Sequence, residues 1–245
     1  MKILGVIPAR YASTRLPGKP LVALAGKPMI ERVWERVRRA ASLSGVVVAT
    51  DDERICSAVK LFGGEVVLTR SDHRSGTERV AEVAVTRKDV EIFVNIQGDE
   101  PLIEPAAIDQ AVEALRGDAE VKVATLAVPV GKPADIMDPN VVKAVLDFDG
   151  NALYFSRAPI PWVRDRGASV HARHLKHLGL YVYRREALLG FPTFPQGDLE
   201  RVEQLEQLRW LENGYRIRVV ETEHDSVGVD VPEDVARVEQ MLKPE

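Results

Sequence analysis

The chain alternates short apolar runs with amphipathic segments through its first 130 residues. Residues 3–9 (ILGVIPA) are apolar and rich in branched side chains. Residues 27–42 instead place apolar side chains every three or four positions, which predicts a helix. Because strands that alternate with helices over short connections pair in parallel, this pattern predicts the α/β class with a doubly wound, mostly parallel sheet.

The same periodicities locate the further elements of the first half. We expect strands at 45–51, 65–70, 90–99 and 121–130, and helices at 51–64, 76–85 and 104–117. Asp51 or Asp52 is a suitable N-cap for the first of these helices, and the glycine pair at 63–64 ends it.

The second half has a different pattern, which predicts antiparallel strands. Residues 140–162 predict two strands joined by a turn at 149–151. Further along we expect a strand at 175–185, a helix at 199–214, a strand at 215–222, and a terminal helix at 231–242 with Pro232 in its first turn. No low-complexity linker divides the halves, so we expect one domain over 1–245, with a smaller antiparallel lobe inserted around 140–185.

Composition excludes several classes of protein. The 33 Lys and Arg against 37 Asp and Glu give a net charge of -4, which argues against a nucleic-acid coat or a membrane-surface protein. No apolar run is long enough to span a membrane. The single cysteine, Cys56, excludes an internal disulfide and fits a reducing compartment. We therefore expect a cytoplasmic protein with no nucleic-acid or membrane partner.

The loop after the first strand carries three cations and no acid. Arg10, Arg15 and Lys19 lie among Gly, Pro, Ser and Thr residues, and the first acidic residue is Glu31. The loop matches neither the P-loop nor the dinucleotide-binding pattern. Its guanidinium and ammonium groups nevertheless suit a polyphosphate, although charged loops are often merely solvated. Its position at the carboxyl end of a strand favours a ligand site.

Two aspartates follow predicted buried strands in distant parts of the chain. Asp99 lies in NIQGDEP and Asp230 in SVGVDVPED. One carboxylate from each of two loops suits Mg²⁺, which completes its shell with water and phosphate oxygens, while helix N-capping is the alternative for each residue. Glu100, Glu233 and Asp234 fit helix-start charges better.

The remaining polar residues suggest a second, anionic ligand. Arg157 ends the run LYFSR, His177 and Tyr181 share one face of a predicted strand, and Glu206 and Gln207 lie on a predicted helix. For a His or Tyr on a half-buried strand, packing is the ordinary alternative, and for Glu or Gln on a helix it is solvation. The histidines and the cysteine have no zinc-binding spacing, and no G-x-S-x-G pattern is present.

Short motifs stand out along the chain: IPARYASTRLPGKPL, GKPMI, VATDD, SGTER, NIQGDEP, ATLAVP, LYFSRAPIPW, HLGLY, LEQLR and GVDVPED. In these motifs the sequence resembles the 3-deoxy-manno-octulosonate (KDO) cytidylyltransferase family, also called CMP-KDO synthetases. The motifs occur in the family's order and span the chain from Ile7 to about Val238. The resemblance implies a nucleotide-diphospho-sugar transferase-like fold, a homodimer, and formation of CMP-KDO from CTP and KDO with Mg²⁺ and release of pyrophosphate, for lipopolysaccharide biosynthesis.

The resemblance also implies roles for individual residues. The triphosphate of CTP would contact Arg10, Arg15 and Lys19, and its base and ribose would contact Arg74, Ser75, Gly76 and Gln97. Mg²⁺ would be held by Asp99 and Asp230, which with Arg10 and Lys19 form the catalytic set. The sugar acid would contact Arg157, His177, Tyr181, Glu206 and Gln207, with Arg157 facing its carboxylate.

Three positions depart from the family's pattern, and other functions stay open. Arg74 stands where Gln is common before SGTER, Val182 where Gly is common, and Val231 where Thr is common. The same chemistry on 8-amino-KDO or a sialic acid remains an alternative, as do a methylerythritol phosphate cytidylyltransferase and a non-catalytic nucleotide-binding protein. LYFSRAPIP and HLGLY favour a carboxylated sugar over a phosphorylated alcohol.

Overall fold

The computed structural model describes residues 1–12, 15–164 and 173–242. Residues 13–14 of the first loop and residues 165–172 of the predicted lobe lie outside the described part. Within it, nine strands form one sheet. Seven follow one another across the sheet: β11 (Ile217–Glu221), β7 (Val123–Pro129), β10 (Leu175–Arg184), β6 (Ile92–Asn95), β1 (Ile3–Ala9), β4 (Gly45–Thr50) and β5 (Glu65–Leu68).

The sheet is mostly parallel, which confirms the predicted fold class. β1 pairs in parallel with both β4 and β6, β4 with β5, and β11 with β7. β10 runs antiparallel between β6 and β7 and joins the two parallel halves. The predicted hairpin is β8 (Lys143–Leu146) and β9 (Ala152–Ser156), and it extends from the start of β10. A separate small sheet, which we did not predict, consists of β2 (Ala23–Leu24) and β3 (Lys27–Pro28).

Helices cover both faces of the sheet. One core contains side chains from α1 (Met29–Val37), α2 (Glu53–Leu61) and α4 (Pro105–Arg116), and the other contains side chains from α3 (Gly76–Thr86), α6 (Arg185–Gly190) and α8 (Gln207–Glu212). β1 supplies both cores, because Ile3 and Ile7 face one and Leu4 and Val6 face the other. This double coverage explains why the strands read as continuous apolar runs.

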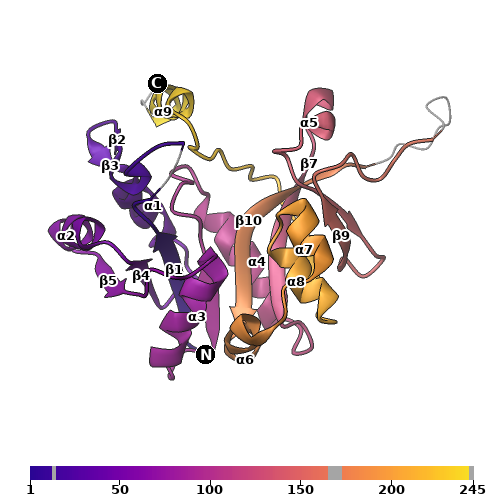
Figure 1. Ribbon diagram of the computed structural model, residues 1–245, viewed down its shortest axis with the longest axis horizontal. Helices are drawn as coiled ribbons and strands as arrows, with labels where there is room; N and C mark the ends of the chain where they lie inside the picture. The colour runs from indigo at the N-terminus through magenta and orange to yellow at the C-terminus, as the bar shows by residue number, and fades with distance from the viewer. Residues whose placement is uncertain (13–14, 165–172, 243–245) are drawn as a thin grey trace.

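The remaining helices are short or lie at the edge of the fold. They are α5 (Pro133–Met137), α7 (Asp198–Glu203), α9 (Pro232–Leu242) and the 3₁₀ turns Lys19–Leu21 and Phe191–Thr193. In Figure 1, α9 lies beside the β2–β3 hairpin, far along the chain from it, and the backbone N–H of Ala25 donates to Glu239 on α9. Among the described residues, no helix is long and apolar enough to cross a membrane.

Several predicted helix signals are confirmed. The Asp52 side chain accepts a hydrogen bond from the backbone N–H of Arg54 and so caps α2, and Gly63 takes a left-handed φ of 77° just after that helix. Pro232 is the first residue of α9, where its missing N–H has no cost.

The predicted single helix at 199–214 was wrong, because α7 and α8 are separated by Gln204 with a left-handed φ of 53°. A continuous helix would use the carbonyls of Glu203 and Gln204 for its own hydrogen bonds. The guanidinium of Arg157 takes both carbonyls instead, Glu203 O at 2.7 Å and Gln204 O at 3.3 Å. A tertiary contact therefore breaks the helix where the local sequence favours continuing it.

Candidate active site

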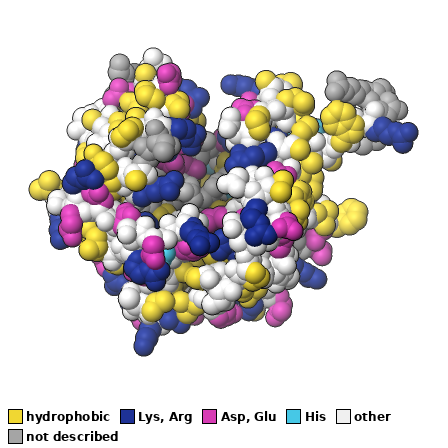
Figure 2. Space-filling view, in the orientation of Figure 1, with side chains coloured by type: hydrophobic (Ala, Val, Ile, Leu, Met, Phe, Trp, Pro, Cys, Tyr) yellow, Lys and Arg dark blue, Asp and Glu magenta, His cyan; other side chains and the backbone are white. Residues whose placement is uncertain are grey.

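A cavity of about 350 Å³ lies at the carboxyl ends of β1 and β6. All nine residues predicted to bind nucleotide or metal line it, namely Arg10, Arg15, Lys19, Arg74, Ser75, Gly76, Gln97, Asp99 and Asp230. Figure 2 shows a hollow in the middle of this face with Lys and Arg side chains around it. Residues from four distant segments therefore converge where a doubly wound sheet binds ligands.

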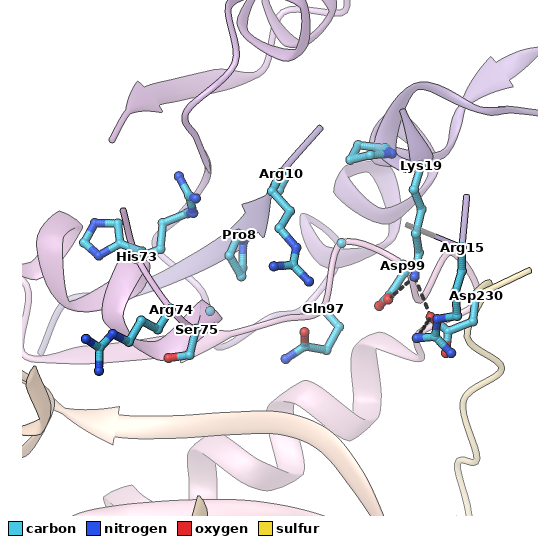
Figure 3. Close-up of a pocket in the computed structure, with 15 residues that line it drawn as sticks. Pro8, Arg10, Arg15, Lys19, His73, Arg74, Ser75, Gln97, Asp99 and Asp230 are labelled. Atoms are coloured by element: carbon cyan, nitrogen blue, oxygen red, sulfur yellow. Dashed lines mark hydrogen bonds and ion pairs between the residues drawn. The ribbon is translucent and has the colours of Figure 1, made fainter. Parts of the chain in front are cut away.

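Charge in this cavity is predominantly positive. Five Lys and Arg side chains line it, against two carboxylates. In Figure 3, Arg10 extends into the middle of the cavity, between Ser75 and Arg74 on one side and Asp99 and Lys19 on the other. The arrangement therefore suits a ligand with several negative charges.

Two glycines fix the backbone that carries the charged groups. Gly18 has a left-handed φ of 66°, and its N–H donates to Tyr11 O at 3.2 Å, which closes the first loop before Lys19. Gly98 lies so close to β1 that an added Cβ would be 2.9 Å from Pro8 O. The loop that carries Asp99 therefore runs directly against the end of the first strand.

Lys19 joins the two predicted metal ligands. Its ammonium nitrogen lies 2.5 Å from Asp99 Oδ2 and 2.8 Å from Asp230 Oδ1 (Figure 3). Arg15 also pairs with Asp230 Oδ1, at 3.0 Å. Both carboxylates therefore reach the same small cationic group.

The backbone holds these two carboxylates together. The N–H of Val229 donates to Asp99 O at 2.9 Å, which ties the two acid-bearing loops to each other. Asp234 in the first turn of α9 accepts from the N–H groups of Asp230 and Val231, at 2.9 and 3.1 Å. Asp234 is thus a helix-start residue, as predicted, and it also orients the loop of Asp230.

Glu100 differs from our prediction of a helix-start charge. α4 begins only at Pro105, with Glu104 at its N-cap, and Glu100 lies in the turn after Asp99. Burial, followed by the negative charge of Asp99, raises the pKa of Glu100 to about 7.

The N-terminus of α3 forms the opposite wall of the cavity. Ser75 caps this helix by accepting from the N–H of Glu78, and both Ser75 and Gly76 line the cavity. A helix N-terminus carries partial positive charge, so this wall adds to the anion preference. Arg74, at the position that departs from the family's pattern, also lies on this wall.

Our sequence reasoning missed Arg79, a buried cation of the SGTER motif that also lines this cavity. Its guanidinium donates to Thr69 Oγ1 at 2.5 Å and lies 3.4 Å from Asp51. The signal in the sequence was a lone charge on the apolar face of the helix at 76–85.

None of the five residues predicted to bind the sugar acid lines this cavity. Glu206 contacts a residue of the cavity wall, and His177 and Tyr181 contact each other. The rings of His177 and Tyr181 are 5.3 Å apart on β10, and Glu206 Oε1 accepts from the hydroxyl of Thr77, next to Gly76, at 2.8 Å. Gln207 is buried at the start of α8. These residues extend from the α3 wall toward β10.

Arg157 is held mainly by the backbone. Its guanidinium donates to the carbonyls of Pro139, Glu203 and Gln204, and its backbone N–H donates to Glu203 Oε2. Its predicted contact with a sugar carboxylate therefore stays a prediction.

Burial also governs the ionisation of the residues toward β10. It lowers the pKa of His177 to about 3 and raises the pKa of Tyr181 well above its usual value, so both are neutral at pH 7. Burial raises the pKa of Glu206 as well, against hydrogen bonds from Ser75 and Thr77 that lower it. Thr77, which our sequence reasoning did not single out, thus links the cavity wall to Glu206.

Comparison with known proteins identifies the family. The sequence model of a family described as cytidylyltransferase matches residues 4–217. The chain belongs to this family. It is 57% identical to a 3-deoxy-manno-octulosonate cytidylyltransferase of Solibacter usitatus over 99% of this chain and 95% of the relative. It is also 53% identical to the protein of the same name from Geobacter metallireducens, over 99% and 98% of the two chains.

Solved structures agree with this assignment. A CMP:2-keto-3-deoxy-manno-octonic acid synthetase complexed with CTP superposes with a TM-score of 0.93 at 43% identity, over 99% of this chain and 98% of that one. A 4-diphosphocytidyl-2C-methyl-D-erythritol synthase from Anaerococcus prevotii, 14% identical with a TM-score of 0.65, shares the fold over 99% of this chain and 97% of its own. The predicted nucleotidyltransferase family and fold are therefore confirmed.

Proposed function

We propose that this enzyme joins CTP to KDO and forms CMP-KDO and pyrophosphate. The observation that carries the proposal is the cation-rich cavity, in which Lys19 and two converging carboxylates face the α3 N-terminus. The choice of KDO as the sugar acid is supported by the names of the close relatives, and the choice of CTP by the complex of the similar structure with CTP.

In the proposed reaction the anomeric hydroxyl oxygen of the sugar bonds to the α-phosphorus of CTP. The bond from that phosphorus to the bridging oxygen of the β-phosphate breaks, pyrophosphate leaves in line, and the hydroxyl proton passes to solvent. Arg10, Arg15 and Lys19 lower the repulsion between the two anionic substrates and stabilise the leaving pyrophosphate. Positioning and charge neutralisation perform the catalysis, so no covalent enzyme intermediate is required.

We also propose that Asp99 and Asp230 hold Mg²⁺. The donor set fits, because both carboxylates contact the same ammonium group, Lys19 Nζ, within 2.8 Å. The described residues contain no cluster of three or more His, Cys, Asp or Glu for a metal, which suits an ion that takes its other ligands from water and phosphate. Mg²⁺ would supply positive charge at the reacting phosphate.

Measuring pyrophosphate release in an Asp99→Asn variant tests this assignment. We expect wild-type protein to release pyrophosphate only when CTP, KDO and Mg²⁺ are all present, and Asp99→Asn to lose that activity while its circular dichroism spectrum is unchanged. Asp89→Asn is the matched control, because Asp89 pairs with Lys2 on the exposed surface. Full activity in Asp99→Asn would contradict the metal assignment.

We further propose a cytoplasmic homodimer that supplies lipopolysaccharide biosynthesis. Large apolar side chains are exposed along the antiparallel hairpin and the segment after it, with Trp162 67% exposed, Phe148 110% and Leu153 63%. Exposed apolar side chains of this size suit an interface between subunits. Sedimentation velocity should give the mass of a dimer for the wild type and a lighter species for a Phe148→Ser, Trp162→Ser double variant. A wild-type monomer would contradict the dimer.

A further inference from the structure

Thr125, a buried residue of β7 that no prediction named, contacts the predicted sugar-site residue His177. Its hydroxyl oxygen is 3.0 Å from His177 Nε2. The same oxygen is 2.6 Å from the carbonyl oxygen of Leu180 and 3.2 Å from that of Leu178. Both carbonyls belong to the stretch of β10 where its register against β7 shifts, between Leu178 and Tyr181. One hydroxyl therefore meets three polar groups.

Counting protons at this hydroxyl fixes the direction of each hydrogen bond. A hydroxyl donates one proton, and a carbonyl oxygen can only accept. The proton of Thr125 therefore points to the carbonyls of β10, with Leu180 O the nearer. Only lone pairs of Oγ1 remain for His177, so the imidazole must donate, and its proton lies on Nε2.

The other ring nitrogen is then left as an acceptor. Burial lowers the pKa of His177 to about 3, so the ring is neutral at pH 7 and carries one proton. The Phe155 and Tyr181 rings pack against the imidazole, with centroids 4.9 and 5.3 Å away. Among the described residues, none makes a hydrogen bond with Nδ1, which leaves the lone pair of this nitrogen available to accept one.

We propose that Thr125 is a positioning residue that locks His177 as the Nε2–H tautomer, so that Nδ1 accepts a hydrogen bond from a hydroxyl group of the sugar acid. The proposal rests on the function proposed above for this site. It also restricts how the sugar binds, because a bare nitrogen lone pair attracts a hydroxyl proton and repels a carboxylate. The carboxylate of the sugar must therefore face away from His177.

The tautomer is tested first, in the wild-type protein without substrate. Protein labelled with ¹⁵N-histidine gives long-range proton–nitrogen correlations for each ring, and a His177→Gln variant identifies the signals of His177. We expect a neutral ring with the proton on Nε2 and none on Nδ1. A proton on Nδ1, a charged ring at pH 7, or two tautomers in exchange would overturn the proposal.

Two substitutions at residue 125 test the consequence for sugar binding. Thr125→Val keeps the shape but has no hydroxyl, whereas Thr125→Ser keeps the hydroxyl. We expect Thr125→Val to raise the KM for KDO about three- to tenfold, as the loss of one oriented hydrogen bond predicts. The KM for CTP should stay within about twofold of wild type, and Thr125→Ser should restore the KM for KDO.

Thr86→Val is the matched control, because the Thr86 hydroxyl donates to Val83 O at the end of α3, away from His177. A parallel rise in both KM values, or no rescue by Thr125→Ser, would show a merely structural role and overturn the proposal. The NMR experiment also separates failure of this proposal from failure of the proposed function. A wild-type protein that makes no CMP-KDO would contradict the proposed function, but its NMR spectrum would still show the tautomer of His177.

Discussion

Gly98 provides a test of how the fold positions the loop that carries Asp99. A Cβ at residue 98 would lie 2.9 Å from Pro8 O, whereas ordinary contacts begin at 3.4 Å. Ile7 Cγ2 and Ile30 Cδ1 lie behind, at 3.5 and 3.7 Å, so the added methyl group has little free space to enter. In Gly98→Ala the loop must therefore move away from β1.

The size of this movement determines the expected effects. Relieving the contact requires a shift of about 0.5 Å, and overpacking of this kind costs about 1–3 kcal/mol of stability. Asp99 is the next residue and moves with the loop. Since a misplacement approaching 1 Å can cost about a hundredfold in rate, we expect Gly98→Ala to lower kcat about ten- to a hundredfold.

Urea unfolding and pyrophosphate release measure the two effects. Gly228→Ala is the matched control, because Gly228 lies in the loop of Asp230 and, within the described part of the chain, its added Cβ would approach nothing nearer than Asp99 O, at 3.9 Å. We expect this control to keep wild-type turnover and stability within about 0.5 kcal/mol. Wild-type turnover in Gly98→Ala, or an equal loss in Gly228→Ala, would refute the reasoning.

Three further variants probe other parts of the account. Glu200→Gln removes the carboxylate 2.6 Å from the buried guanidinium of Arg209 and leaves Glu78, at 3.4 Å, as its acidic partner. Urea unfolding should therefore show a loss of about 2 kcal/mol, and a loss below about 1 kcal/mol would contradict this. His177→Gln tests a pH effect: below pH 6.5 the unfolded chain protonates His177, while the folded protein does so only near its pKa of about 3. Wild-type stability should therefore fall between pH 7 and 5 by about 1–2 kcal/mol more than that of His177→Gln, and parallel curves would contradict this. Lys19→Met should lower pyrophosphate release about a hundredfold or more, because its ammonium group faces both carboxylates, and unchanged release would remove Lys19 from the catalytic set.

The convergence of the residues predicted to bind phosphate and metal could be foreseen from the sequence. Continuous apolar runs and runs of helical periodicity place Arg10, Asp99 and Gly76 at one edge of a doubly wound sheet, and all three line the same cavity. Ligands of a doubly wound sheet bind at the carboxyl ends of its strands, so locating the site requires only the direction of the strands. The alternation of strands and helices along the sequence predicts that direction.

The features that the sequence did not predict depend on contacts between distant segments. The break between α7 and α8 follows from Arg157, more than forty residues earlier, which takes the carbonyls of Glu203 and Gln204. Thr125 lies inside an apolar run and Thr77 at the start of a predicted helix, where a threonine reads as an ordinary strand or helix residue. Their roles become visible only when the structure shows which group each hydroxyl faces.

Identification of the reaction product is the most direct test of the central claim. Purified protein is incubated with KDO, Mg²⁺ and either CTP, UTP, ATP or GTP, and the products are resolved by mass spectrometry alongside pyrophosphate release. The account predicts CMP-KDO and pyrophosphate in equal amounts with CTP, far less product with the other nucleotides, and none without the sugar acid. Pyrophosphate release without KDO, or equal product formation from UTP, would contradict the account.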